Sequence, residues 1–90
     1  MVKVENMTTS SGNSVKNQFV ILDTADRINY LQSYNSIIVK IDQDNKVYLD
    51  AKYWNYSTTT SKYRNMYLHE TRKETEKKIE SGEYILIDLN

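Results

Sequence analysis

The only histidine of this 90-residue chain, His69, is the first candidate for acid–base chemistry or metal binding. If it lies in a helix, its neighbours three and four positions away are Asn65, Met66, Arg72 and Lys73. None of these is a carboxylate, and a catalytic imidazole needs a partner that orients it or exchanges a proton with it. We therefore interpret His69 as a surface residue of a helix.

Two pairs of aspartates are spaced closely enough to share a cation, Asp23 with Asp26 and Asp42 with Asp44. A calcium loop needs more oxygen ligands in a fixed register, a glycine at the turn and a closing glutamate. The sequence after Asp44 provides neither the glycine nor the glutamate. Aspartate and asparagine are also typical of tight turns, which explains these residues without an ion. The sequence predicts no metal site.

Glycines are scarce, since the chain contains only Gly12 and Gly82. Loops that cradle phosphates need several glycines in a fixed pattern, and the strained serine nucleophile of many hydrolases is flanked by two of them. Neither pattern is present. We therefore expect a protein that is not an enzyme and that uses no cofactor.

Residues suited to recognition concentrate between positions 53 and 67. This segment holds four of the eight tyrosines, the only tryptophan and five consecutive hydroxyl residues. Tyrosine, tryptophan and arginine dominate the energetics of protein interfaces, and the same side chains can stack on nucleic-acid bases. The predicted partner-binding residues are Tyr53, Trp54, Tyr56, Lys62, Tyr63, Arg64 and Tyr67. The alternative is that Trp54, Tyr56 and Tyr63 form the core between a helix and a sheet, and the sequence leaves both open.

The elements that must position this segment follow from the pattern around it. Short runs of β-branched and aromatic residues between polar turns predict strands, and the hairpin over residues 36–50 has the clearest pattern. Hydroxyl residues at 57–61 are favourable helix N-caps, and Gly82 is typical of a helix end. The expected elements are strands at 19–22, 27–34, 36–42 and 47–49, a helix at 62–81 and a strand at 83–90.

This order, β-β-β-β-α-β, predicts an α+β fold in which one helix packs across a face of a mostly antiparallel sheet of about five strands. We expect a single domain over residues 17–90. Residues 1–16 are rich in serine, threonine and asparagine, which indicates a flexible N-terminal arm. The alternative for this arm is that Val2, Val4 and Met7 pair onto a sheet edge.

The composition narrows the class of protein and of partner. Twelve basic and twelve acidic residues give a formal net charge of zero, which favours a mixed-charge protein surface over salt-driven phosphate binding. The absence of cysteine fits a reducing, cytoplasmic compartment. The apolar runs are far shorter than the roughly 20 residues that span a bilayer, so we expect no membrane segment.

Several short motifs resemble a group of small uncharacterised proteins carried by bacteriophages and mobile elements of Gram-positive bacteria. The motifs are NQFVI at 17–21, LQSY at 31–34, LD at 49–50, YWNYSTTT at 53–60 and KYRN at 62–65. The resemblance covers residues 17–90 and brings no catalytic residues with it. It implies a setting in which small proteins often block host defence by binding a host complex, including as anti-CRISPR proteins.

The sequence therefore predicts a small non-enzymatic protein of the bacterial host cytoplasm that binds and inhibits a host protein complex, in a counter-defence, anti-CRISPR-like role. The alternative is a small nucleic-acid-binding module or regulator that uses the basic aromatic helix. An edge strand without proline also leaves open a homodimer through the sheet edge.

Overall fold

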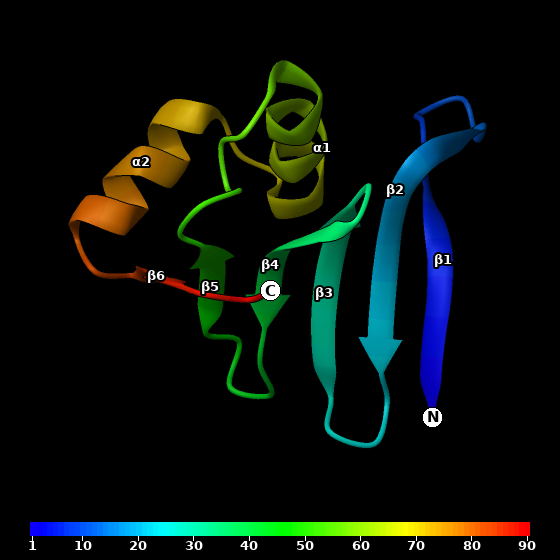
Figure 1. Cartoon of the computed structure of the whole chain (residues 1–90), viewed down its shortest axis with the longest axis horizontal. Helices are drawn as coiled ribbons and strands as arrows, with labels where there is room; N and C mark the ends of the chain where they lie inside the picture. Colours follow the sequence, from blue (N-terminus) through cyan, green and yellow to red (C-terminus); the bar gives the residue numbers. More distant parts are fainter.

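The computed structural model describes residues 1–90 and contains one six-stranded sheet and two helices (Figure 1). The strands lie in chain order across the sheet, antiparallel from β1 to β5 and parallel between β5 and β6. The elements are β1 (Val2–Thr8), β2 (Ser14–Asp23), β3 (Ile28–Ser33), β4 (Ser36–Ile41), β5 (Val47–Asp50), α1 (Thr58–Leu68), α2 (Arg72–Glu80) and β6 (Tyr84–Ile87). The α+β class and the mostly antiparallel sheet are confirmed, with six strands and two helices instead of five and one.

The single helix predicted for residues 62–81 is two helices in the structure. α1 ends at His69, which has a left-handed backbone with φ of 56°, and a residue in that conformation cannot continue the helix. α2 begins with a capping box, in which the side chains of Thr71 and Glu74 each accept a hydrogen bond from the other's backbone N–H. The Thr-x-x-Glu spacing at Thr71 is the sequence signal for this second start.

The N-terminal residues 1–16 are paired with the sheet, which corrects the prediction of a flexible arm. β1 lies antiparallel to β2, with Val4 opposite Ile21. The polar residues between the two strands form a turn, in which Gly12 has φ of 86° and donates its N–H to the carbonyl of Thr9 at 2.9 Å. The serine- and threonine-rich composition therefore belongs to a turn, and the alternative of pairing at the sheet edge describes the structure.

The core lies on the face of the sheet that the helices cover. Leu31, Val39 and Leu49 are opposite one another on β3, β4 and β5, and all three are fully buried. Half-buried residues of the helices and of the preceding loop pack against this row: Tyr53, Trp54, Tyr63, Tyr67, Leu68 and Ile79. This packing fixes where α1 begins relative to the ends of β3 and β4. Neither helix is long and apolar enough to cross a membrane.

The opposite face of the sheet, called the outer face below, has no helix on it. The register places one row of its side chains across all six strands: Val4, Ile21, Tyr30, Lys40, Tyr48 and Ile85. Lys40 extends over the ring of Tyr48, with its Nζ 5.5 Å from the ring centroid. In Figure 1 both helices lie beside β3 to β6, and β1 and β2 extend away from them.

Candidate functional site

A pocket of about 300 Å³ opens between the β3–β4 turn and the N-terminus of α1. Hydroxyl groups and aromatic rings make up most of its lining, and none of the lining residues carries a charge. We call it the tyrosine pocket. Its lining residues are Ser33, Tyr34, Asn35, Ser36, Ile38, Tyr53, Tyr56, Ser57 and Thr60.

The β3–β4 turn holds Tyr34 on one side of the tyrosine pocket. Tyr34 has a left-handed backbone with φ of 55°, as a tight turn between adjacent strands often requires. Its N–H donates to the carbonyl of Asn17 at 2.7 Å, and its carbonyl accepts from the Nε2 of Gln32 at 2.7 Å. Because both backbone groups are bonded, the turn is fixed while the Tyr34 side chain remains 51% exposed.

The first turn of α1 forms a second side of the tyrosine pocket. Ser57 is the N-cap, and its Oγ accepts the N–H of Thr60 at 3.1 Å. The Thr60 hydroxyl lies 3.2 Å from the hydroxyl of Ser33 at the end of β3, and both residues are buried. This hydroxyl pair joins the helix start to the sheet inside the pocket.

Tyr53 and Tyr56 complete the pocket from the loop between β5 and α1. Their rings meet edge to face with 5.4 Å between the centroids. Such a pair is favourable beyond the area that it buries, so it stiffens the loop. Tyr56 is 70% exposed, and it is the most exposed large hydrophobic side chain of the lining.

Arg64 fixes the same loop from the inside. Its side chain is fully buried, and its guanidinium donates to the carbonyl of Trp54 and to the Oδ1 of Asn65 at 2.9 Å. The guanidinium carbon also lies 5.1 Å from the centroid of the Trp54 ring. Burial lowers the pKa of Arg64, and the nearby positive charge of Arg72 lowers it further. Arg64 therefore positions the loop, and it offers no surface to a partner.

Asp50 holds the beginning of the loop. Its carboxylate accepts the N–H of Tyr53 at 2.8 Å and of Lys52 at 3.1 Å. It also accepts the N–H of Leu89 at 2.8 Å and the side-chain amide of Asn90 at 3.0 Å. Burial alone would raise the pKa of Asp50, but these hydrogen bonds outweigh it and lower the pKa below its ordinary value. Asp50 thus ties the loop to the C-terminal residues.

The residues predicted to bind a partner divide into four groups. Tyr53 and Tyr56 line the tyrosine pocket, and Lys62 is exposed on α1. Trp54, Tyr63 and Tyr67 pack against the core, as the alternative interpretation expected for Trp54 and Tyr63. Burial raises the pKa of Tyr67 to about 12. The buried position of Arg64 corrects its place among the partner-contacting residues.

Sequence reasoning missed the part of the tyrosine pocket that comes from the β3–β4 turn. Ser33, Tyr34, Asn35 and Ser36 lie in or beside a polar pair that the sequence marks only as a turn. No local pattern connects this turn to Ser57, because the contact depends on how α1 packs on the sheet. The one available signal is the exposed tyrosine beside the turn, a residue type that interfaces favour.

His69 and the two aspartate pairs, which are the candidates for chemistry, lie at a helix end and at turns. His69 is exposed at the left-handed end of α1. The Oδ1 of Asp23 accepts the N–H groups of Ala25 and Asp26, and the Oδ1 of Asp42 accepts that of Asp44 at 2.9 Å. Both aspartates therefore stabilise turns, as the preference of aspartate for tight turns predicts.

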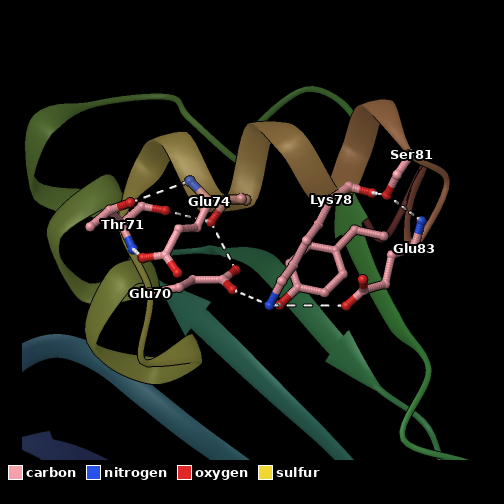
Figure 2. A network of polar contacts seen from close by, with 8 residues as sticks. Glu70, Thr71, Glu74, Lys78, Ser81 and Glu83 are labelled. Carbon is pink, nitrogen blue, oxygen red and sulfur yellow. Dashed lines mark hydrogen bonds and ion pairs between the residues drawn. The ribbon is translucent and has the colours of Figure 1, made fainter.

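A separate polar cluster connects α2 to β6 (Figure 2). The Nζ of Lys78 donates to Glu70 at 2.7 Å and lies 3.4 Å from the hydroxyl of Tyr84. Thr75 donates its hydroxyl to the other carboxylate oxygen of Glu70 at 2.9 Å. The hydrogen bond to Glu70 is the main reason that the pKa of Lys78 is raised. The cluster fastens both ends of α2 and lies outside the lining of the tyrosine pocket.

The chain matches the model of a protein family. The model of a family of unknown function, DUF8033, matches residues 2–83, which include β1 and the whole lining of the tyrosine pocket. No curated protein and no solved structure matches the chain.

Proposed function

The chain belongs to the DUF8033 family of unknown function, and we propose that it is a small non-enzymatic protein that binds another protein through the tyrosine pocket. The observation that carries this proposal is the pair of exposed tyrosines, Tyr34 and Tyr56, beside a pocket whose backbone is held in place. Tyrosine offers a large contact area with few torsions to immobilise, so a rigid support increases the free energy available for binding.

The lining of the tyrosine pocket indicates the chemistry of the partner. Hydroxyl groups of Ser36 and Ser57 lie among the aromatic rings, with no charged group beside them. A volume of about 300 Å³ is at the lower end of small-molecule pockets and suits one large side chain. We therefore propose that the partner inserts an uncharged side chain with both apolar surface and a hydrogen-bonding atom.

The biological setting of this proposal comes from the sequence resemblance to small bacteriophage and mobile-element proteins. In that setting the partner is a protein complex of the bacterial host, in the host cytoplasm. Binding would inhibit the complex by occupying a surface that it needs, which is a counter-defence role of the anti-CRISPR type. The small size and the exposed aromatic residues support a role as a binding inhibitor.

The nucleic-acid alternative receives less support from the same segment. It relies on basic side chains beside aromatic rings, because each phosphate contact needs a lysine or an arginine. Of the two basic residues in the segment, Arg64 is fully buried and bonded to the loop, and only Lys62 is exposed. The exposed basic residues Arg72, Lys73 and Lys77 lie on α2, outside the aromatic segment. The tyrosine pocket itself is uncharged, so the protein partner is the better-supported proposal.

The test compares capture of host proteins by three forms of the chain from a nuclease-treated lysate of a Gram-positive bacterium. The forms are the natural sequence, a pocket variant with Tyr34→Asn and Tyr56→Ser, and a control variant with Tyr48→Ser. Asparagine tolerates the left-handed backbone at position 34, so the turn is retained. Tyr48 lies on the outer face, so its replacement leaves the pocket intact.

We expect one host complex to be retained by the natural chain and by the control variant, and to be lost with the pocket variant. Titration of the purified partner should then show binding at least about tenfold weaker for the pocket variant, since two interface tyrosines together contribute more than 1.4 kcal/mol. Equal capture by all three forms, or a partner that is captured from an untreated lysate and lost from the nuclease-treated one, would contradict the proposal.

A further inference from the structure

β1 is an edge strand whose outer side faces no other element. It contains no proline, and the side chains of Val2 and Val4 are 61% and 60% exposed. Natural edge strands usually carry features that prevent pairing with another chain, such as proline, bulges or a row of like charges. The register of β1 against β2 shifts only between Asn6 and Thr8, so Val2 to Asn6 form a regular edge. We propose that β1 pairs antiparallel with β1 of a second copy of this chain, with Val4 opposite Val4 of the second copy.

The backbone of β1 presents its free hydrogen-bonding groups at alternate residues. The carbonyl of Met1 accepts the N–H of Thr24 at 2.9 Å, so Met1 directs its backbone toward β2. Because backbone groups alternate in direction along an antiparallel strand, Val2, Val4 and Asn6 direct theirs outward. A two-fold axis through Val4 brings Val2 opposite Asn6 of the second copy, and each outward residue then meets another outward residue.

The charges on β1 select this register over its neighbours. Lys3 and Glu5 are the only charged residues of the strand, and they lie on the same face of the sheet. With the axis at Val4, Lys3 lies opposite Glu5 of the second copy, and the reverse pair forms at the same time. An axis at Lys3 would oppose two lysines, and an axis at Glu5 would oppose two glutamates. Like charges directly opposite are destabilising, so complementarity favours the axis at Val4.

The shape of the molecule leaves room for this pairing. Figure 1 shows α2 on the β6 side of the sheet and α1 above β3 and β4, with β2 between the helices and β1. An axis perpendicular to the sheet keeps the helices of both copies on the same face, away from the new junction. The outer faces of the two copies become continuous, and Val4 meets Val4 of the second copy there. The pair would form a single twelve-stranded sheet.

The test is a charge exchange across the proposed junction. Sedimentation equilibrium over a range of concentrations should show the natural chain approaching twice its mass of 10.6 kDa. Lys3→Glu places two glutamates opposite two others, and Glu5→Lys does the same with lysines. We expect each single variant to raise the dimer dissociation constant at least about tenfold.

Mixing the two single variants restores opposite charges at both positions, so an equimolar mixture should regain the dimer that each variant lacks. The double variant with both changes should also dimerise. Val4→Pro removes an outward N–H that β2 does not use, and it should abolish the dimer while circular dichroism shows the same fold. Lys73→Glu, an exposed change on α2, is the matched control and should dimerise like the natural chain.

A natural chain that remains at 10.6 kDa at all concentrations would overturn the proposal, and it would leave β1 free for a strand of a different protein. A dimer whose dissociation constant is unchanged in both single variants would also overturn it, since another surface would then make the contact. Restoration by the mixture is the result specific to this register. None of these outcomes depends on the tyrosine pocket.

Discussion

Gln18 is a buried amide without a visible role in the fold. It lies on β2 opposite Ser33, it is fully buried, and neither atom of its amide group has a hydrogen-bond partner. Burying an unpaired amide is unfavourable by about 1 to 3 kcal/mol. We therefore expect Gln18→Met, which keeps the length of the side chain, to raise the free energy of unfolding by about 1 kcal/mol.

Urea denaturation of the natural chain and the Gln18→Met variant measures this change. The matched control is Gln32→Met, because Gln32 donates its amide to the carbonyl of Tyr34 at 2.7 Å. The same substitution there should lower stability by about 0.5 to 1 kcal/mol. If Gln18→Met also lowered the free energy of unfolding, the amide of Gln18 would have hydrogen-bond partners in solution. The prediction from its unpaired, buried amide would then be wrong.

Asp50 makes the stability of the protein depend on acid pH. Its hydrogen bonds lower its pKa in the folded state below the value of 3.8 for a free aspartate. A carboxyl group whose pKa is lower in the folded state than in the unfolded state stabilises the fold at pH values above its unfolded pKa. This contribution is lost as the pH falls through its folded pKa. We expect Asp50→Asn to be about 2 kcal/mol less stable at pH 7, and this difference to shrink as the pH falls below about 4.

Urea denaturation at pH 7, 5 and 3 would measure the stability gap between the natural chain and the Asp50→Asn variant. Asp26→Asn is the control, because Asp26 is exposed in the β2–β3 turn. The difference in stability between Asp26→Asn and the natural chain should stay small at all three pH values. A gap for Asp50→Asn that is unchanged at pH 3 would contradict the role of the ionised carboxylate.

At the scale of elements, Arg64 joins α1 to the loop that carries Tyr53 and Tyr56. Arg64→Ala removes the donors to Trp54 and Asn65 and leaves their half-buried acceptors unpaired, so we expect a loss of about 2 to 3 kcal/mol in the free energy of unfolding. Fluorescence of Trp54, the only tryptophan, reports both the unfolding and the changed environment of its ring. Lys62→Ala, an exposed change on the same helix, should stay within about 0.5 kcal/mol.

The cluster of Figure 2 determines how firmly α2 is held on β6. The Glu70 side chain is only 3% exposed and receives both Lys78 and Thr75. We expect Glu70→Ala to lower stability by about 1.5 to 3 kcal/mol, since hydrogen bonds to a charged group are lost inside the structure. Arg72→Ala breaks the exposed pair with Glu76 and should change stability by less than about 0.5 kcal/mol. Thermal denaturation would measure the stability of both variants. Equal losses of stability would contradict the larger contribution that we assign to the buried cluster around Glu70.

The local sequence determined most of the elements, and long-range packing determined the rest. The alternation in β4 and the turn before β5 were sufficient to predict the hairpin. The N-terminal strand was only the alternative to a flexible arm, because the polar residues that favoured an arm form the turn between β1 and β2. Residue type led to Tyr53 and Tyr56, which line the tyrosine pocket and whose contact with a partner stays a prediction. Composition does not distinguish an exposed arginine from one that is buried against Trp54, as Arg64 is.

For the whole molecule, the helices pack on only one part of the sheet, with α1 against β3 and α2 against β6. Residues of β3, β4 and β5 form the buried row under the helices, whereas Val2 and Val4 of β1 remain largely exposed. Edge segments with little buried apolar surface open locally before the global unfolding reaction. The monomer should therefore open from the β1 side of the sheet.

Amide hydrogen exchange of the Glu5→Lys variant, at concentrations where it is a monomer, tests this gradient. We expect the amides of Leu31 and Val39 to exchange only through global unfolding, because both residues belong to the fully buried row. The β1 amides should exchange through local opening with a free energy at least about 2 kcal/mol lower. Protection of β1 equal to that of β3 would mean that the sheet opens as one cooperative unit, and that the helices are not the source of its stability.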